Sequence, residues 1–190
     1  MYAIIQNNQI TQLGELYSLF PNEPKPTHQY AIAHGAVEVI EGQREDERFY
    51  WVTFDQYVVS NGTVTRQYSN VPKALDDKEE SDESGNPLFV QVYDPAADNG
   101  KGAMVNTTER LVTKGLRSQH IAQFKATANS MLSQTDWTVI RKAERGVEIP
   151  ADVAAKRAAI LAECDRLIAA VTAAQDMPAF IAAVRSANWG

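Results

Sequence analysis

The residues that most often carry chemistry lie far apart in this sequence. The three histidines, His28, His34 and His120, fit no metal-binding spacing such as HExxH or CxxC. The single cysteine, Cys164, falls in a stretch predicted to be helical, where a small buried apolar role is typical. We therefore predict no metal site, no cofactor and no cysteine nucleophile.

Phosphate-binding and nucleophile motifs are also missing from the sequence. Gly100, Lys101 and Gly102 predict a flexible loop, because a P-loop needs four residues between its first glycine and its Gly-Lys-Ser/Thr ending. No GxSxG follows a predicted strand. A pair of catalytic carboxylates stays open at this point, since such acids are usually distant in the chain. We predict a protein without enzymatic activity and keep a small enzyme as an alternative.

Composition and charge set further limits on partners. Residues 1–104 carry 7 Lys and Arg against 16 Asp and Glu, while residues 105–190 carry 11 against 8. An acidic front half argues against nucleic-acid binding, which needs clustered cations. No apolar run approaches the roughly 20 residues that cross a bilayer, and the N-terminus lacks the pattern of a signal peptide. We expect no membrane partner and a protein that folds in a cytoplasm.

Residues 1–75 are predicted to form a small antiparallel β domain. Segments rich in β-branched and aromatic residues indicate its strands: residues 2–6, 36–42, 48–54, 56–60 and 63–68. Asn61 and Gly62 predict a hairpin, since a type I′ turn needs positive φ at both central residues. Together with the helices expected later in the chain, this pattern predicts an α+β fold.

Residues 76–104 are predicted to be an acidic linker with one further strand. The acidic bias of residues 76–86 indicates a disordered or solvated segment. Residues 88–93 are typical of a strand, which could rejoin the N-terminal sheet.

Residues 105–190 are predicted to form a C-terminal helical hairpin or bundle. One apolar stripe begins at Ile121 and includes Phe124 and Ala128 at helical spacing, and Gly115 is expected to interrupt or kink that helix. A second long helix is expected to start at Pro150. Its predicted apolar stripe is Val153, Arg157, Ile160, Leu161, Cys164, Leu167, Ile168 and Val171. A last short helix is expected after Asp176.

The stretch around Trp137 predicts a sharp helical elbow. Ser133, Thr135 and Asp136 all favour N-cap positions, so one helix ends and another begins with almost no loop. We expect one of these three side chains to cap the second helix. The indole of Trp137 is expected to close the corner by burying a large apolar area.

The elbow and its surroundings carry a resemblance to a known family. The run at residues 128–137 reads Ala-Asn-Ser-Met-Leu-Ser-Gln-Thr-Asp-Trp, and Pro150, Arg157 and Trp189 follow it. From about residue 110 to 190 the sequence resembles the C-terminal region of tail-fibre assembly proteins of tailed bacteriophages. That family carries a helix ending in Leu-Leu-x-x-Thr-Asp-Trp, then a proline-led helix with an arginine. Here Met131 replaces the first leucine of the pattern.

The resemblance implies a non-enzymatic, chaperone-like protein in the host cytoplasm. Such a protein would bind the phage tail-fibre protein and assist the folding, trimerisation or attachment of the fibre. The residues expected either to contact the partner or to hold the protein itself together surround the elbow: Leu132, Trp137, Val139, Ile140 and Arg141. The long Ala-rich helix over residues 151–174 favours an alternative, in which the chain is a permanent component of the fibre or baseplate, in an oligomer, and stays in the virion tail.

Overall fold

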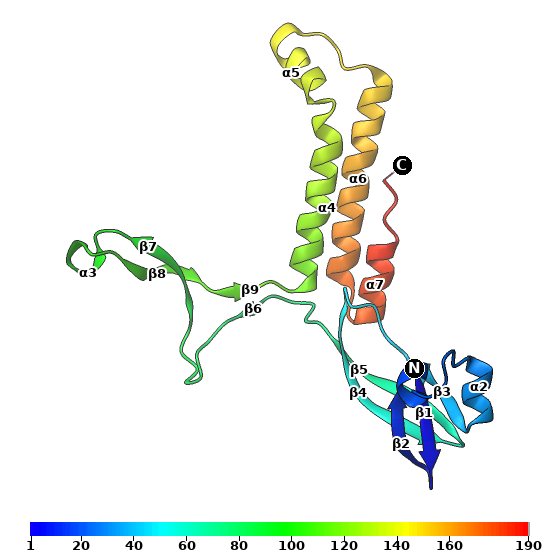
Figure 1. Ribbon diagram of the computed structural model, residues 1–190. Helices are drawn as coiled ribbons and strands as arrows, with labels where there is room; N and C mark the ends of the chain where they lie inside the picture. Colours follow the sequence, from blue (N-terminus) through cyan, green and yellow to red (C-terminus); the bar gives the residue numbers. More distant parts are fainter. Residues whose placement is uncertain (190) are drawn as a thin grey trace. The chain divides into compact units, whose positions relative to one another are not determined.

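The computed structural model describes residues 1–189, and the chain divides into two compact units, Met1–Pro72 and Lys73–Gly190. The first unit is built on an antiparallel-rich sheet and the second contains the long helices (Figure 1). This combination confirms the predicted α+β class.

The first unit contains a five-stranded sheet with the order β2-β1-β3-β5-β4. Its strands are β1 (Tyr2–Gln6), β2 (Gln9–Gly14), β3 (Ala36–Glu41), β4 (Tyr50–Ser60) and β5 (Thr63–Pro72). Neighbouring strands are antiparallel except for β3 and β5, which are parallel. The hairpin between β4 and β5 is confirmed, and Asn61 and Gly62 have φ of 50° and 75°.

Two small apolar clusters stabilise this sheet. One joins Tyr2 to Ala31 and Ala36, and the other joins Ala3, Val39 and Val64. Two short helices follow the strands β1 and β2, namely α1 (Leu16–Leu19) and α2 (His28–Ala33). Helix α2 was not expected from the sequence, because six residues show too little periodicity to reveal a helix.

The acidic stretch at residues 76–86 is mostly exposed but has defined local structure. Strand β6 (Lys78–Glu79) pairs with β9 (Val112–Thr113). The Asp82 carboxylate accepts hydrogen bonds from the backbone N–H groups of Ser84 and Asn86, at 2.9 and 2.8 Å. This pattern is typical of an Asx turn. The Asn86 side-chain amide also donates to the carboxylate at 3.0 Å and is the largest cause that holds the pKa of Asp82 below its usual value, followed by the Asn86 backbone N–H.

The helical character expected from residue 105 begins only at Leu116. The residues around position 105 instead form the strand β8 (Ala103–Arg110), which pairs with β7 (Phe89–Asp94). The short helix α3 (Ala97–Gly100) lies in the connection between the two strands. Strand β7 therefore pairs within the second unit and does not rejoin the N-terminal sheet. Gly115 does not kink a helix but stands at its N-cap, where an added Cβ would lie 2.3 Å from the backbone oxygen of Asp76.

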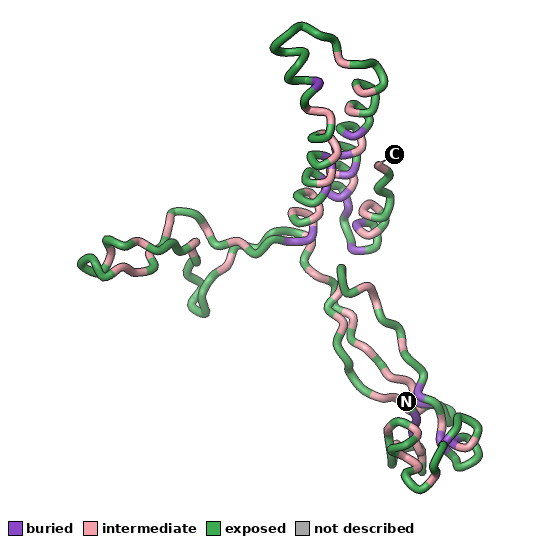
Figure 2. Tube along the Cα trace, turned by 45° about the horizontal axis from the view of Figure 1, so that its top comes forward, coloured by how far each residue is buried: buried purple, intermediate pink, exposed green. Residues whose placement is uncertain are grey.

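Four helices follow the β7–β8 ribbon: α4 (Leu116–Ser133), α5 (Asp136–Arg145), α6 (Ala151–Ala173) and α7 (Met177–Arg185). Helices α4 and α6 lie side by side, and α7 packs against α6 (Figure 1). The seam between α4 and α6 is buried, as the purple positions in Figure 2 show. Its buried side chains include Phe124, Ala128, Ile160, Cys164, Leu167 and Val171. Leu161, which was expected in this stripe, is 51% exposed.

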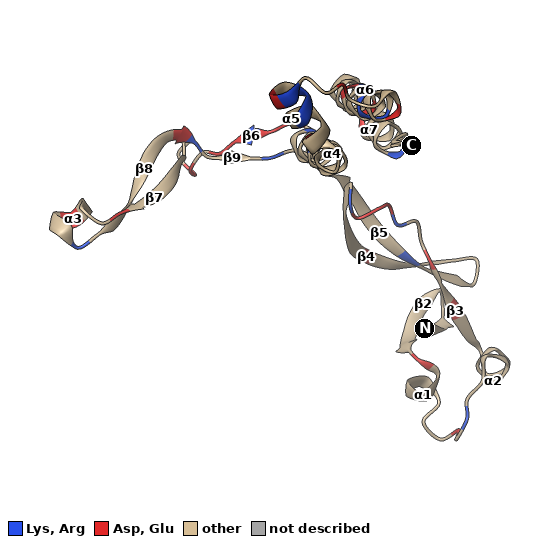
Figure 3. Ribbon diagram, turned by 90° about the horizontal axis from the view of Figure 1, so that it is seen from above, with Lys and Arg blue, Asp and Glu red and all other residues tan. Residues whose placement is uncertain are grey.

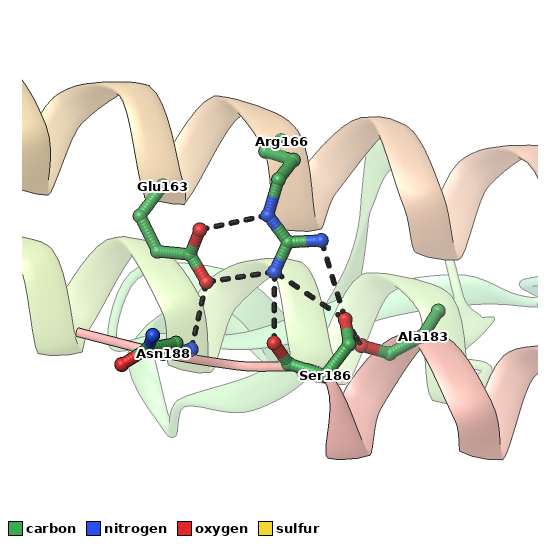
Figure 4. A network of polar contacts seen from close by, with 5 residues as sticks. All are labelled: Glu163, Arg166, Ala183, Ser186 and Asn188. Atoms are coloured by element: carbon green, nitrogen blue, oxygen red, sulfur yellow. Dashed lines mark hydrogen bonds and ion pairs between the residues drawn. The ribbon is translucent and has the colours of Figure 1, made fainter. Parts of the chain in front are cut away.

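A polar cluster on α6 holds the segment that follows α7 (Figure 4). The Arg166 guanidinium pairs with Glu163 at 2.7 Å and donates to the backbone oxygen of Ser186 at 2.9 Å. Glu163 also accepts the Asn188 backbone N–H at 2.8 Å. These contacts lower the pKa of Glu163 from 4.5 to about 2, the bond from Arg166 being the largest cause. They fix the chain just before Trp189, which is half-buried.

Candidate functional site

The predicted elbow is present, since only Gln134 and Thr135 separate the end of α4 from the start of α5. Its capping differs from the expectation. Thr135 occupies the N-cap position of α5, but no side chain caps the helix there. The Thr135 hydroxyl instead donates back to the Leu132 carbonyl at 3.1 Å. The expected N-cap bond is therefore replaced by contacts that tie the elbow to the preceding helix.

Arg157, on α6, joins both sides of the elbow. Its Nη1 donates to the Leu132 carbonyl at 2.8 Å and to the Thr135 hydroxyl at 2.7 Å, while Nη2 pairs with the Asp136 carboxylate at 2.9 Å. The Arg157 side chain is only 19% exposed. Charge-assisted bonds of this kind are stronger than neutral ones, and the planar guanidinium fixes their directions. We call this set of four residues the elbow clamp.

Thr138 is the one residue of α5 that is buried, at 3% exposure. Its hydroxyl donates to the Thr135 carbonyl at 2.6 Å. Because successive residues of a helix are about 100° apart, a buried Thr138 turns Trp137 away from the corner.

The Trp137 side chain is 58% exposed, so the prediction that it closes the corner is wrong. The elbow clamp and Thr138 hold the corner instead of the indole. The expected contribution of a buried tryptophan to stability is therefore absent, and the large apolar surface of the ring faces outward.

The outer face of α5 is apolar and uncovered in the described structure. Ile140 is 55% exposed and lies on the same face as Trp137, with the exposed Arg141 beside it. Val139, at 40% exposure, lies on another side of the helix. The structure thus brings together Trp137, Ile140 and Arg141, which we call the α5 face.

Leu132 is placed apart from the α5 face. It is half-buried on α4, where it lines a shallow groove with Ala128, Leu161 and Cys164. Its backbone carbonyl, rather than its side chain, takes part in the elbow clamp. Of the five predicted residues, Leu132 therefore has a structural role that the sequence did not indicate.

The end of α5 is basic. Arg141, Lys142 and Arg145 give this helix the blue segment visible in Figure 3. Lys142 pairs with Glu148 at 2.6 Å, and Gly146, with φ of 67°, forms the C-cap of the helix. Basic residues near a helix C-terminus interact favourably with the helix dipole. The α5 face is consequently an apolar patch bordered by positive charge.

Arg157 is the functional residue whose role the sequence analysis missed. It was placed in the apolar stripe of α6 with Val153 and Ile160, and a charged residue at a core position is the signal that could have revealed its role. In the structure Arg157 contacts Leu132, Thr135 and Asp136, although it lies more than twenty residues after them in the sequence.

Within residues 1–189, no three His, Cys, Asp or Glu side chains gather where a metal ion could bind. In the same residues no helix is long and apolar enough to span a bilayer. Comparison of the chain with protein-family models, curated proteins and solved structures finds no match.

Proposed function

We propose that this protein is a non-enzymatic, chaperone-like assembly factor that binds subunits of a phage tail fibre. The observation that supports binding is the α5 face, an apolar helix surface that the described rest of the second unit leaves uncovered. The choice of a fibre subunit as the partner comes from the resemblance of residues 110–190 to tail-fibre assembly proteins.

The geometry of the elbow suits a binding helix better than a structural one. An exposed tryptophan beside an exposed isoleucine costs solubility and adds nothing to the core. Tryptophan and arginine are also the residues most enriched in binding hot spots, and Trp137 and Arg141 share the α5 face. The elbow clamp holds α5 in place before binding, which lowers the entropy cost of association.

In this proposal α5 inserts its apolar face into a groove of an immature fibre subunit. A subunit that has not yet trimerised exposes apolar surface and unpaired strand edges, which favour aggregation. Trp137 and Ile140 would cover part of that surface as helix-in-groove anchors, and Arg141 would contact its polar rim. Trimerisation then displaces the helper, because the subunits bury the same surface against one another.

The test is co-expression of this chain with the tail-fibre protein of the same phage. We expect soluble trimeric fibre and co-purification of the two chains. The double variant Trp137→Ala, Ile140→Ala is expected to lose co-purification while its thermal melt stays within a few degrees of the wild type. Leu161→Ala, which removes an equally exposed leucine from α6, is the matched control and should bind normally.

Fibre that is soluble and trimeric without this chain would contradict the proposal. Mass spectrometry of purified virions distinguishes the alternative role. Stoichiometric amounts of the chain in virions would favour a permanent fibre or baseplate component, whereas a transient helper is absent from the finished particle.

A further inference from the structure

The edges of the sheets are the second kind of uncovered surface in this protein. Unpaired strand edges carry free backbone N–H and C=O groups and invite pairing with another chain. Among the described strands of five or more residues, four stand at a sheet edge: β2, β4, β7 and β8.

Three of these four strands carry a bulge of their own. Strand β4 has one extra residue between Phe54 and Tyr57, compared with the part of β5 that pairs with it. Strand β2 has one extra residue opposite β1, and β8 has two extra residues between Asn106 and Arg110. Bulges twist an edge and interrupt its pattern of hydrogen-bonding groups, so they protect these strands from pairing with other chains.

Strand β7 is less protected, and its one charged residue, Asp94, stands at its last position. It contains no bulge, lysine or proline within Phe89–Asp94. Just before it, the Leu88 N–H donates to the Glu80 carbonyl at 3.0 Å, so the open edge begins at Phe89. Val92 and Tyr93 are 47% and 62% exposed. A two-stranded ribbon is only marginally stable alone in water, so β7 gains stability from another strand.

The sequence of β7 indicates which strand that is. Residues 89–93 read Phe-Val-Gln-Val-Tyr, which has the same pattern of side chains in both directions. When two such strands pair antiparallel around Gln91, Phe89 faces Tyr93 of the second copy and Val90 faces Val92. Aromatic and β-branched pairs of this kind stabilise antiparallel sheets.

We propose that β7 is a homodimer interface, in which its free edge pairs antiparallel with β7 of a second copy and Gln91 lies on the two-fold axis. The interface is isologous, so the same residues serve both partners. The result is a continuous sheet with the order β8-β7-β7-β8.

Gln91, at the centre of the proposed dimer sheet, already makes a side-chain contact across the β7–β8 pair. Its Nε2 donates to the Asn106 Oδ1 on β8 at 3.0 Å, on the face that also holds Phe89 and Tyr93. Pairing around Gln91 places the two glutamine amides next to each other and extends this contact into a row of four amides. The α5 face takes no part in this contact, so the interface does not depend on fibre binding.

The test is analytical ultracentrifugation of the full chain and of charge variants at Gln91. We expect a dimer for the wild type, and a dissociation constant raised at least about tenfold in both Gln91→Lys and Gln91→Glu, because like charges then face each other directly. A mixture of the two variants should restore the dimer, since opposite charges meet only if Gln91 faces Gln91. Thr108→Lys and Thr108→Glu, at an exposed position of β8, are the controls and should leave the dimer unchanged.

Three outcomes would overturn the proposal. The first is a wild-type chain that stays monomeric at about 0.1 mM, a concentration at which a specific interface is occupied. The second is a dimer that survives both charge variants, and the third is a mixture that fails to restore it. Far-UV circular dichroism of each variant checks that the helices remain folded, so loss of the dimer cannot be mistaken for unfolding.

Discussion

Helix α6 contacts both α5 and the residues after α7 through an arginine side chain. Helices α5 and α7 differ in whether their apolar side chains are buried. Arg157 holds the start of α5 through the Asp136 carboxylate. Arg166, paired with Glu163 on α6 itself, holds the residues after α7 by donating to the Ser186 carbonyl. Helix α7 buries Met177 and Phe180. Helix α5 buries only Thr138 and leaves Trp137 exposed.

Helix α7 stabilises the fold, whereas α5 exposes its apolar side chains to solvent. Helix α7 is held mainly by burial of apolar area, and its polar contacts add to that. Helix α5 has almost no apolar burial, so the elbow clamp is the main interaction that keeps it in position. Loss of a buried apolar side chain should therefore affect α7 most, and loss of a polar contact should affect α5 most.

The largest effect on stability is expected from Phe180→Ala. The Phe180 side chain is fully buried and its ring lies edge-on to His120, with the centroids 5.4 Å apart. Truncation removes the apolar contacts and leaves a cavity, so we expect a loss of about 3–5 kcal/mol in the free energy of unfolding. Urea denaturation followed by circular dichroism measures it. A loss as small as that from Trp137→Ala would show that α7 is not the better-packed helix.

A smaller and more local effect is expected from Arg157→Ala. Without the guanidinium, α5 loses its ion pair and two hydrogen bonds, and we expect α5 to detach while the α4–α6 pair stays folded. Hydrogen exchange should show at least tenfold faster exchange in α5, about 1.4 kcal/mol. Lys156→Ala removes a neighbouring exposed cation as the control. Unchanged protection of α5 in Arg157→Ala would mean that the elbow clamp does not hold it.

The sequence predicted the features that depend on a few neighbouring residues. Asn61 and Gly62 allow the positive φ of a hairpin turn, and Asp176 caps α7 by accepting the Ala179 N–H at 2.8 Å. The start of α6 directly after Pro150 follows a similar local rule. These signals act within one turn of the chain, so they need no knowledge of the fold.

The features that depend on distant residues could not be predicted in the same way. Trp137 faces outward because Arg157, twenty residues further along, holds the corner in place of the indole. Residues 105–110 form a strand because β7 pairs with them, although their own pattern was assigned to a helix. Trp137, Ile140 and Arg141 were expected near the partner from the sequence, but the exposure of the indole was not, since the sequence indicated a buried tryptophan.

The smallest expected effect concerns the Arg166 contact, and it appears only in acid. Because the pKa of Glu163 is about 2 in the fold and 4.5 in the unfolded chain, its ionised form stabilises the protein fully above pH 4.5. That contribution is lost as the pH falls from 4.5 towards 2. We expect Glu163→Gln to flatten this part of the pH dependence of the unfolding free energy, while Glu148→Gln, at an exposed ion pair of α5, leaves it unchanged. If the unfolding free energy of Glu163→Gln and of the wild type changes equally with pH, the acid sensitivity comes from other carboxylates. The end of the chain is then held by apolar burial in α7 and not by the Arg166–Glu163 contact.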